Sequence, residues 1–146
     1  MRPLELKEML SEIKSENPEI NKTITLVDDS DLADFVSEVS TSDNMLLIGV
    51  IPSYGHKGKI SSFKMLPVFQ LQILEKTDYS AINNDDFVML YERTLIVTEK
   101  VRDFVLDKME DGCYPMLSGL DMSNVDIDPV RGKASCNGWT IDFFTQ

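Results

Sequence analysis

Residues that could carry out catalysis are sparse in this sequence, and histidine occurs only once. That residue, His56, lies in a polar segment beside Lys57 and Lys59. A serine or cysteine nucleophile would depend on this imidazole as its general base. The neighbouring positive charges disfavour the protonated imidazole, but they supply none of the geometry that acid–base catalysis requires. We therefore interpret His56 as an exposed loop residue, and no catalytic residue is predicted.

Two segments come close to ligand-binding motifs without completing them. Gly58-Lys59 would end a phosphate-binding loop if a glycine stood five positions earlier and Ser or Thr followed, but Ser53 and Ile60 occupy those places. The second segment breaks the EF-hand calcium pattern at its third ligand and lacks the glycine of that pattern. Its carboxylates belong to Asp28, Asp29, Asp31 and Asp34. Because acids favour the start of a helix, we interpret this segment as a solvated helix start.

The remaining chemically active side chains also have structural interpretations. Asp126 and Asp128 share one face of a strand, and paired carboxylates hydrolyse glycosidic bonds. Two acids on one strand are more often its polar face, which we favour. Cys113 and Cys136 are predicted to be reduced, partly buried thiols, because no Cys-x-x-Cys pair surrounds them. Trp139 is predicted to anchor the core. No metal site and no cofactor are predicted.

Length and charge restrict the classes of partner. The chain has 146 residues, 14 Lys and Arg and 25 Asp and Glu, which gives a formal net charge of −11. One domain over 1–146 is expected. Binding to nucleic acid or to anionic membranes depends on clustered Lys and Arg, so neither partner is expected. No apolar signal core or membrane-spanning run is present in the sequence, and we expect a cytoplasmic protein.

The elements that would position these residues follow from hydrophobic periodicity. Apolar residues at helical spacing predict helices over 4–16 and 85–109, with a short helix from Leu32. Asp85 or Asp86 would cap the long helix at its start, and Gly112 would close its end. Apolar and β-branched runs predict strands over 23–27, 45–51, 65–75, 120–128 and 133–144.

Two of these strands carry further expectations. The strand over 45–51 is apolar throughout and should be buried on both faces. The strand over 65–75 alternates between apolar and polar residues and should be half-buried.

Pro129 and Gly132 mark the turn between the last two strands. This order predicts an α+β fold in which an N-terminal helix and one long helix pack on one face of a mainly antiparallel sheet of about four to five strands.

Charge is distributed unevenly along the chain. The segment 28–43 has acids and no base, and the following segment 44–74 has bases and no acid. The basic and imidazole side chains of the second segment are His56, Lys57, Lys59 and Lys64. Buried strands that exclude charge explain much of this pattern. The alternative is a head-to-tail subunit contact between these residues and Asp28, Asp29, Asp31 and Asp34 of another copy, which closes into a ring if the rotation permits.

The C-terminal pattern carries a resemblance to a known family. Residues 125–130 and the closing Gly-Trp-x-Ile-x-Phe pattern within 136–143 are combined with the helix and strand order above. Together they resemble small tail-completion proteins, the tail-terminator-like proteins of phages and prophages of Bacteroidetes-type elements. The resemblance implies rings, commonly hexameric, that cap the tail tube and join it to the head. It implies no catalytic residues, and an acidic channel wall would let DNA pass without adhering. The acidic and basic segments match no motif of that family.

These observations lead to one favoured function and two alternatives. The favoured one is a non-enzymatic structural or assembly protein, a ring-forming terminator or neck component of a phage or prophage tail. Its partners would be further copies of itself and other tail or head–tail connector proteins. The first alternative is a soluble acidic binding or adaptor module of the immunity type, which would form a stable complex with a basic partner. The least favoured is a small enzyme that uses Asp126 and Asp128 or Cys113.

Overall fold

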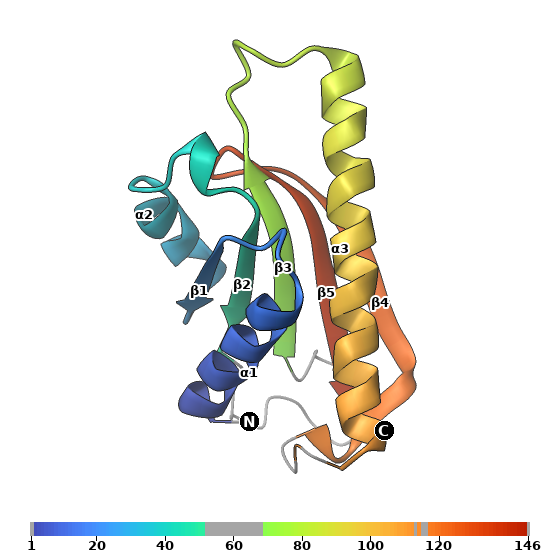
Figure 1. The fold of residues 1–146 in the computed structure, drawn as a ribbon. Helices are drawn as coiled ribbons and strands as arrows, with labels where there is room; N and C mark the ends of the chain where they lie inside the picture. The colour runs from blue at the N-terminus through green and yellow to red at the C-terminus, as the bar shows by residue number, and fades with distance from the viewer. Residues whose placement is uncertain (1, 52–68, 113, 115–116, 146) are drawn as a thin grey trace, which may run out of the picture.

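Helices cover both faces of a mixed five-stranded sheet (Figure 1). The computed structural model describes residues 2–51, 69–112, 114 and 117–145, apart from the side chains of residues 29, 69 and 145. In chain order the helices and strands are α1 (Pro3–Glu16), β1 (Lys22–Leu26), α2 (Leu32–Val36), β2 (Leu46–Val50), β3 (Phe69–Lys76), α3 (Asn84–Glu110), β4 (Leu120–Lys133) and β5 (Cys136–Thr145). Short 3-10 turns at Asp29–Asp31 and Thr41–Asp43 lie on either side of α2.

The sheet has the strand order β1-β2-β3-β5-β4. Pairing is parallel between β1 and β2 and antiparallel between the other neighbours. The predicted α+β class and mainly antiparallel sheet are therefore confirmed, and the parallel pair makes the sheet mixed. Parallel strands need a crossover of about a dozen residues or more. Residues 27–45, which include α2, supply that crossover.

The strand register divides the core into two layers. On one face, Leu71 of β3 lies between Gly49 of β2 and Ile141 of β5. Helices α1 and α3 cover this face side by side, as Figure 1 shows, and bury its apolar residues. On the opposite face, α2 buries Leu32 and Val36 against the other side chains of β1, β2 and β3. The prediction of α1 and α3 on one face is thus confirmed, and α2 lies on the other.

The long helix α3 follows the predicted apolar stripe. Its buried residues are Leu90, Thr94, Val97, Thr98, Val101, Phe104 and Val105. Its cap is Asn83, whose Oδ1 accepts a hydrogen bond from the Asp86 N–H at 2.8 Å. The predicted cap at Asp85 or Asp86 is therefore wrong, whereas Gly112 ends the helix at φ +66° as predicted. None of the described helices combines the length and the apolar character needed to cross a bilayer.

Strand β2 is buried on both faces as predicted, and β3 departs from its prediction. The alternation over 65–75 predicts one exposed face, yet Gln72 and Leu74 on that face are buried. Strand β3 lies at the centre of the sheet, and Leu74 packs in the layer under α2. A central position therefore buries polar as well as apolar side chains of this strand. The predicted residues 65–68 lie outside the described part of the chain.

The turn between β4 and β5 lies later than predicted. It is made by Ala134 and Ser135, which adopt φ values of 49° and 61°. Pro129 instead lies within β4, which forms one edge of the sheet and, among the described strands, pairs only with β5. An edge strand tolerates proline because the missing N–H can face away from the sheet. The register of β4 also shifts at two places.

Gly138 of β5 gives the first testable prediction. Its φ is +153°, and a Cβ at this position would lie 2.1 Å from the Ile73 carbonyl oxygen. Because that neighbour is backbone, Gly138→Ala should lower the free energy of unfolding by about 3 kcal/mol. Gly119→Ala is the control: φ is +91°, but nothing lies within 4 Å of the added Cβ, and about 1 kcal/mol is expected. Chemical denaturation followed by circular dichroism measures both, and equal losses would contradict the prediction.

Candidate functional site

The predicted basic side of the subunit contact lies outside the described residues. His56, Lys57, Lys59 and Lys64 all fall within 52–68. Their contact with an acidic segment of another copy stays a prediction. The acidic side lies in the described part of the chain, except for the side chain of residue 29.

The acidic residues of the predicted contact begin in the turn that leads into α2. The Asp31 carboxylate accepts a hydrogen bond from the Asp28 N–H at 3.2 Å, and the Asp28 carboxylate accepts one from the Ser30 N–H at 3.0 Å. Asp31 stands at the N-cap of α2 but makes no side-chain hydrogen bond to the helix. The segment stands at the start of α2, as the sequence predicts. The Asp28 and Asp31 carboxylates stabilise the turn before the helix, and the expected cap by the Asp31 side chain is not made. Asp28 and Asp34 are exposed.

Exposed apolar side chains stand among these acids. The exposed fraction is 71% for Val27 and 51% for Phe35. Asp31 precedes Phe35 by one helical turn, so both side chains lie on the same side of α2. We call this surface the acidic knob, and it consists of Val27, Asp28, Asp31, Asp34, Phe35 and Glu38. It combines carboxylates with two large exposed apolar side chains.

A groove lies on the opposite face of the sheet, between α3 and the segments around β2. We call it the α3 groove; its volume is about 360 Å³ and it is lined by Glu19, Asn44, Met45, Glu75, Arg93, Ile96 and Val97. Most of the lining surface is apolar, and charged side chains stand at the rim. No sequence motif indicated this groove, because its walls come from separate parts of the chain.

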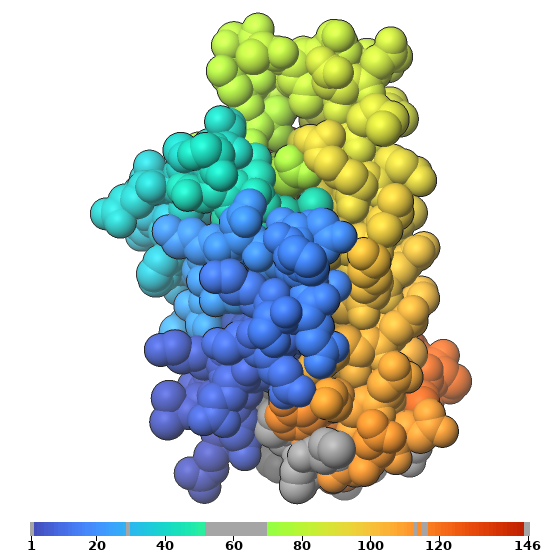
Figure 2. Space-filling model, viewed as in Figure 1, coloured from blue at the N-terminus to red at the C-terminus, as the bar shows by residue number. Residues whose placement is uncertain are grey.

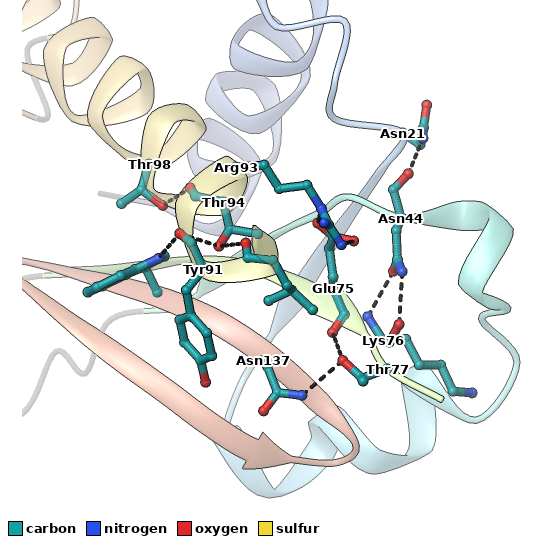
Figure 3. Close-up of polar contacts among 12 residues, drawn as sticks. Asn21, Asn44, Glu75, Lys76, Thr77, Tyr91, Arg93, Thr94, Thr98 and Asn137 are labelled. Carbon is teal, nitrogen blue, oxygen red and sulfur yellow. Dashed lines mark hydrogen bonds and ion pairs between the residues drawn. The ribbon is translucent and has the colours of Figure 1, made fainter. Parts of the chain in front are cut away.

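An ion pair between β3 and α3 forms one wall of the α3 groove (Figure 3). Arg93 Nε donates to Glu75 Oε2 at 2.6 Å, and Arg93 Nη2 donates to Glu75 Oε1 at 2.9 Å. The Glu75 side chain is 9% exposed and that of Arg93 is 49% exposed. These hydrogen bonds raise the pKa of Arg93 above its ordinary value, so the guanidinium stays charged. The pair fixes α3 against the sheet.

Asn44 joins the groove to β3 through its side-chain amide. Its Nδ2 donates to the Lys76 carbonyl at 2.9 Å, and its Oδ1 accepts from the Lys76 N–H at 2.8 Å. The Asn44 carbonyl in turn accepts a hydrogen bond from Asn21 Nδ2. The amide thus pairs with β3 just before β2 begins and holds one wall of the groove (Figure 3).

Lys76 also reaches across to α2. Its Nζ donates to the carbonyls of Val36 and Val39 at 3.0 Å and 2.7 Å. These carbonyls belong to the end of α2 and the residues that follow, where helix geometry leaves acceptors without partners. Lys76 therefore fixes the helix that carries the acidic knob.

A second polar network ties the β4–β5 turn to the end of β3. Asn137 is fully buried; its Nδ2 donates to Thr77 Oγ1 at 2.9 Å, and its Oδ1 accepts from the Gly132 N–H at 2.8 Å (Figure 3). Tyr91 Oη donates to the Val130 carbonyl at 2.6 Å. These bonds satisfy buried polar groups. The network is structural, and the sequence analysis gave no indication of it.

The side chains that the sequence analysis considered for catalysis or ligand binding lie in separate parts of the structure. Asp126 and Asp128 are exposed on β4, and the residues opposite them in β5 are Asp142 and Thr140. This is the polar strand face that the alternation predicts. Trp139 is half-buried, and its indole N–H donates to the Tyr91 carbonyl at 2.9 Å, which anchors β5 to α3. No group of three or more potential metal ligands occurs within the described residues.

Cys136 is buried in the layer under α2. Burial raises the pKa of its thiol to about 11, and nearby Lys76 only partly offsets this increase. Such a thiol stays protonated near neutral pH, and the thiolate is the nucleophilic form. Cys113 lies outside the described residues.

Comparison of the chain with protein-family models, with curated proteins and with solved structures gives no match. The resemblance to tail-completion proteins therefore stays a prediction.

The ion pair at the groove gives the second testable prediction. Arg93→Met should lower the free energy of unfolding by about 2 kcal/mol, because it leaves the Glu75 carboxylate nearly buried without its partner. Glu75→Gln combined with Arg93→Met should cost less than Arg93→Met alone, since the double variant buries no charge. Urea denaturation of the two single variants and the double variant measures the coupling. Losses that simply add would contradict this account.

Cys136 gives the third testable prediction, for alkaline pH. Folding raises the pKa of its thiol from about 9.0 to about 11, so the folded chain binds the proton more tightly than the unfolded chain. The resulting stabilisation is complete below the lower value and is lost as the pH rises through the higher one. The free energy of unfolding should thus fall more steeply between these values for the parent than for Cys136→Ala. Parallel slopes in denaturation at stepped pH would contradict the prediction.

Proposed function

We propose that this chain is a non-enzymatic structural protein that self-assembles into a ring, as a terminator or neck component of a phage or prophage tail. The observation that carries the proposal is the position of the large exposed apolar side chains. Val27 and Phe35 are exposed on the acidic knob, and Met89 and Ile96 are exposed on α3, where Ile96 also lines the α3 groove. Apolar groups that cluster on a surface among charged residues mark sites of protein contact.

The position of these two surfaces supports contact between copies. The acidic knob and the α3 groove lie over opposite faces of the sheet. Two different surfaces on opposite sides of one chain favour head-to-tail association, which closes into a ring when the rotation between neighbours permits. The exposed carboxylates of Asp126 and Asp128 add negative charge to an outer strand. A ring that displays such charge toward its channel would repel the phosphates of DNA.

The oligomeric state gives the fourth testable prediction. The purified chain should form a defined oligomer in light scattering as its concentration rises, and electron microscopy should show rings. A monomer at every concentration up to the high micromolar range, without rings, would overturn the proposal. A monomer that forms a stable 1:1 complex with a basic protein would favour the acidic binding or adaptor module instead. Both measurements use the intact chain.

A further inference from the structure

We propose that β1 pairs with β1 of a second copy of this chain, antiparallel, around a two-fold axis at Ile24. The inference goes beyond the proposed function, because it adds a contact that a head-to-tail ring does not require. Strand β1 lies at the opposite edge of the sheet from β4 (Figure 1). In Figure 2 the light-blue residues of this region reach the surface at the left, between the darker blue α1 and the teal segment with α2.

The outer edge of β1 offers backbone groups for such pairing. The Leu26 carbonyl faces β2, where it is close to the end of that strand and accepts a hydrogen bond from the Ile51 N–H at 2.7 Å. In a parallel ladder alternate residues direct both backbone groups to the same neighbour. The even-numbered residues of β1 therefore face β2, and the odd-numbered ones, Thr23 and Thr25, face away from it. Among the described residues, no hydrogen bond involves the Thr23 or Thr25 backbone.

The residues of β1 also suit the addition of a strand. Thr23, Ile24 and Thr25 are β-branched, a type of residue that favours pairing in sheets. The strand contains no proline, and its register with β2 has no shift. Its outer edge is therefore a regular row of backbone donors and acceptors, which is the usual template for another strand.

The strand is complementary to itself in one antiparallel register. When Ile24 lies opposite Ile24 of the second copy, Thr23 lies opposite Thr25, and all five residues of β1 are paired. Thr23 and Thr25 then exchange both N–H···O bonds, and the axis generates this pair twice. Lys22 lies opposite Leu26, so no like charges face each other across the contact.

Charge favours a second copy over another extended chain. Lys22 is exposed, and none of the ion pairs among the described residues involves it. Asp28 follows β1 by two residues and is exposed; its carboxylate accepts one hydrogen bond from the Ser30 N–H and can accept more. In the register above, Lys22 lies diagonal to Asp28 of the second copy, a separation that a long side chain bridges. The axis repeats this pairing of opposite charges.

The two-fold geometry also determines the surroundings of the contact. An axis normal to the sheet keeps α2 of both copies on one face and α1 of both copies on the other. Val27, which is 71% exposed, directly follows the strand and lies beside the contact. A contact that uses the same surface of both copies ends with two copies. Rings that also use it should therefore be joined in pairs.

Cysteine cross-linking tests the register. Thr23→Cys and Thr25→Cys are made in separate chains, both with Cys113→Ser, and the chains are mixed and oxidised. Opposed residues of a hydrogen-bonded pair have Cα atoms about 5.5 Å apart, which is within the limit of about 7 Å for a disulfide. We therefore expect covalent dimers from the mixture.

Each cysteine variant alone is the control for this cross-link. Identical positions are offset by two residues, so their Cα atoms lie about 8 Å apart, and few covalent dimers should form. Equal yields from the mixture and from each variant alone, or no covalent dimer in any of them, would overturn the inference.

A proline substitution tests the backbone hydrogen bonds without a cross-link. Thr25→Pro removes an outward N–H that β2 does not use, so the fold should persist while self-association weakens at least about tenfold. Thr25→Val keeps the N–H and should associate like the parent. Analytical ultracentrifugation measures both dissociation constants, and circular dichroism checks the fold. Equal dissociation constants for the two variants would contradict the inference.

A charge exchange keeps the test valid if the proline variant does not fold. Lys22→Glu should also weaken the dimer, and Asp28→Lys in the same chain should restore part of the affinity. Dimers through β1 without rings would support the inference and overturn the proposed function. Rings without the cross-link would overturn the inference alone, and a monomer under all conditions would overturn both.

Discussion

The fold depends on the end of β3, where two neighbouring charged residues hold helices on opposite faces of the sheet. Glu75 accepts hydrogen bonds from Arg93 of α3, and the Nζ of Lys76 donates to carbonyls at the end of α2. Successive side chains of a strand point to opposite faces, so adjacent residues can serve both layers. Asn44 pairs with the Lys76 backbone at the same place. The α3 groove and the helix of the acidic knob are both positioned from this strand end.

Periodicity made the general fold predictable, but not the polar contacts. The apolar stripes of α1 and α3 and the mainly antiparallel sheet followed from spacing alone. One signal was available for Glu75, because the alternation of 69, 71 and 73 places residue 75 on the apolar face. A carboxylate on that face requires a partner. The identity of Arg93 depends on how α3 is rotated on the sheet, which local spacing does not determine.

The turn between β4 and β5 was mispredicted for a similar reason. Pro129 and Gly132 are strong turn formers, whereas Ala134 and Ser135 rarely adopt positive φ. Long-range pairing with β5 outweighs these local preferences, and Asn137 holds the turn from inside by accepting the Gly132 N–H. The residues predicted to make a subunit contact show the same limit of sequence information. The acids near α2 were visible as a run in the sequence. The exposure of the apolar side chains beside them, Val27 and Phe35, could be learned only from the structure.

The edge strand β4 limits how this chain can associate. An exposed strand edge offers unpaired backbone groups on which other chains can add strands, the usual route to aggregates without a fixed size. Pro129 of this strand has no backbone donor, the register of β4 shifts at two places, and Asp126 and Asp128 add exposed carboxylates to it. Each of these features discourages strand addition. These features therefore disfavour growth of the sheet on the β4 side and favour association through side chains, which gives assemblies of fixed size more readily than fibrils.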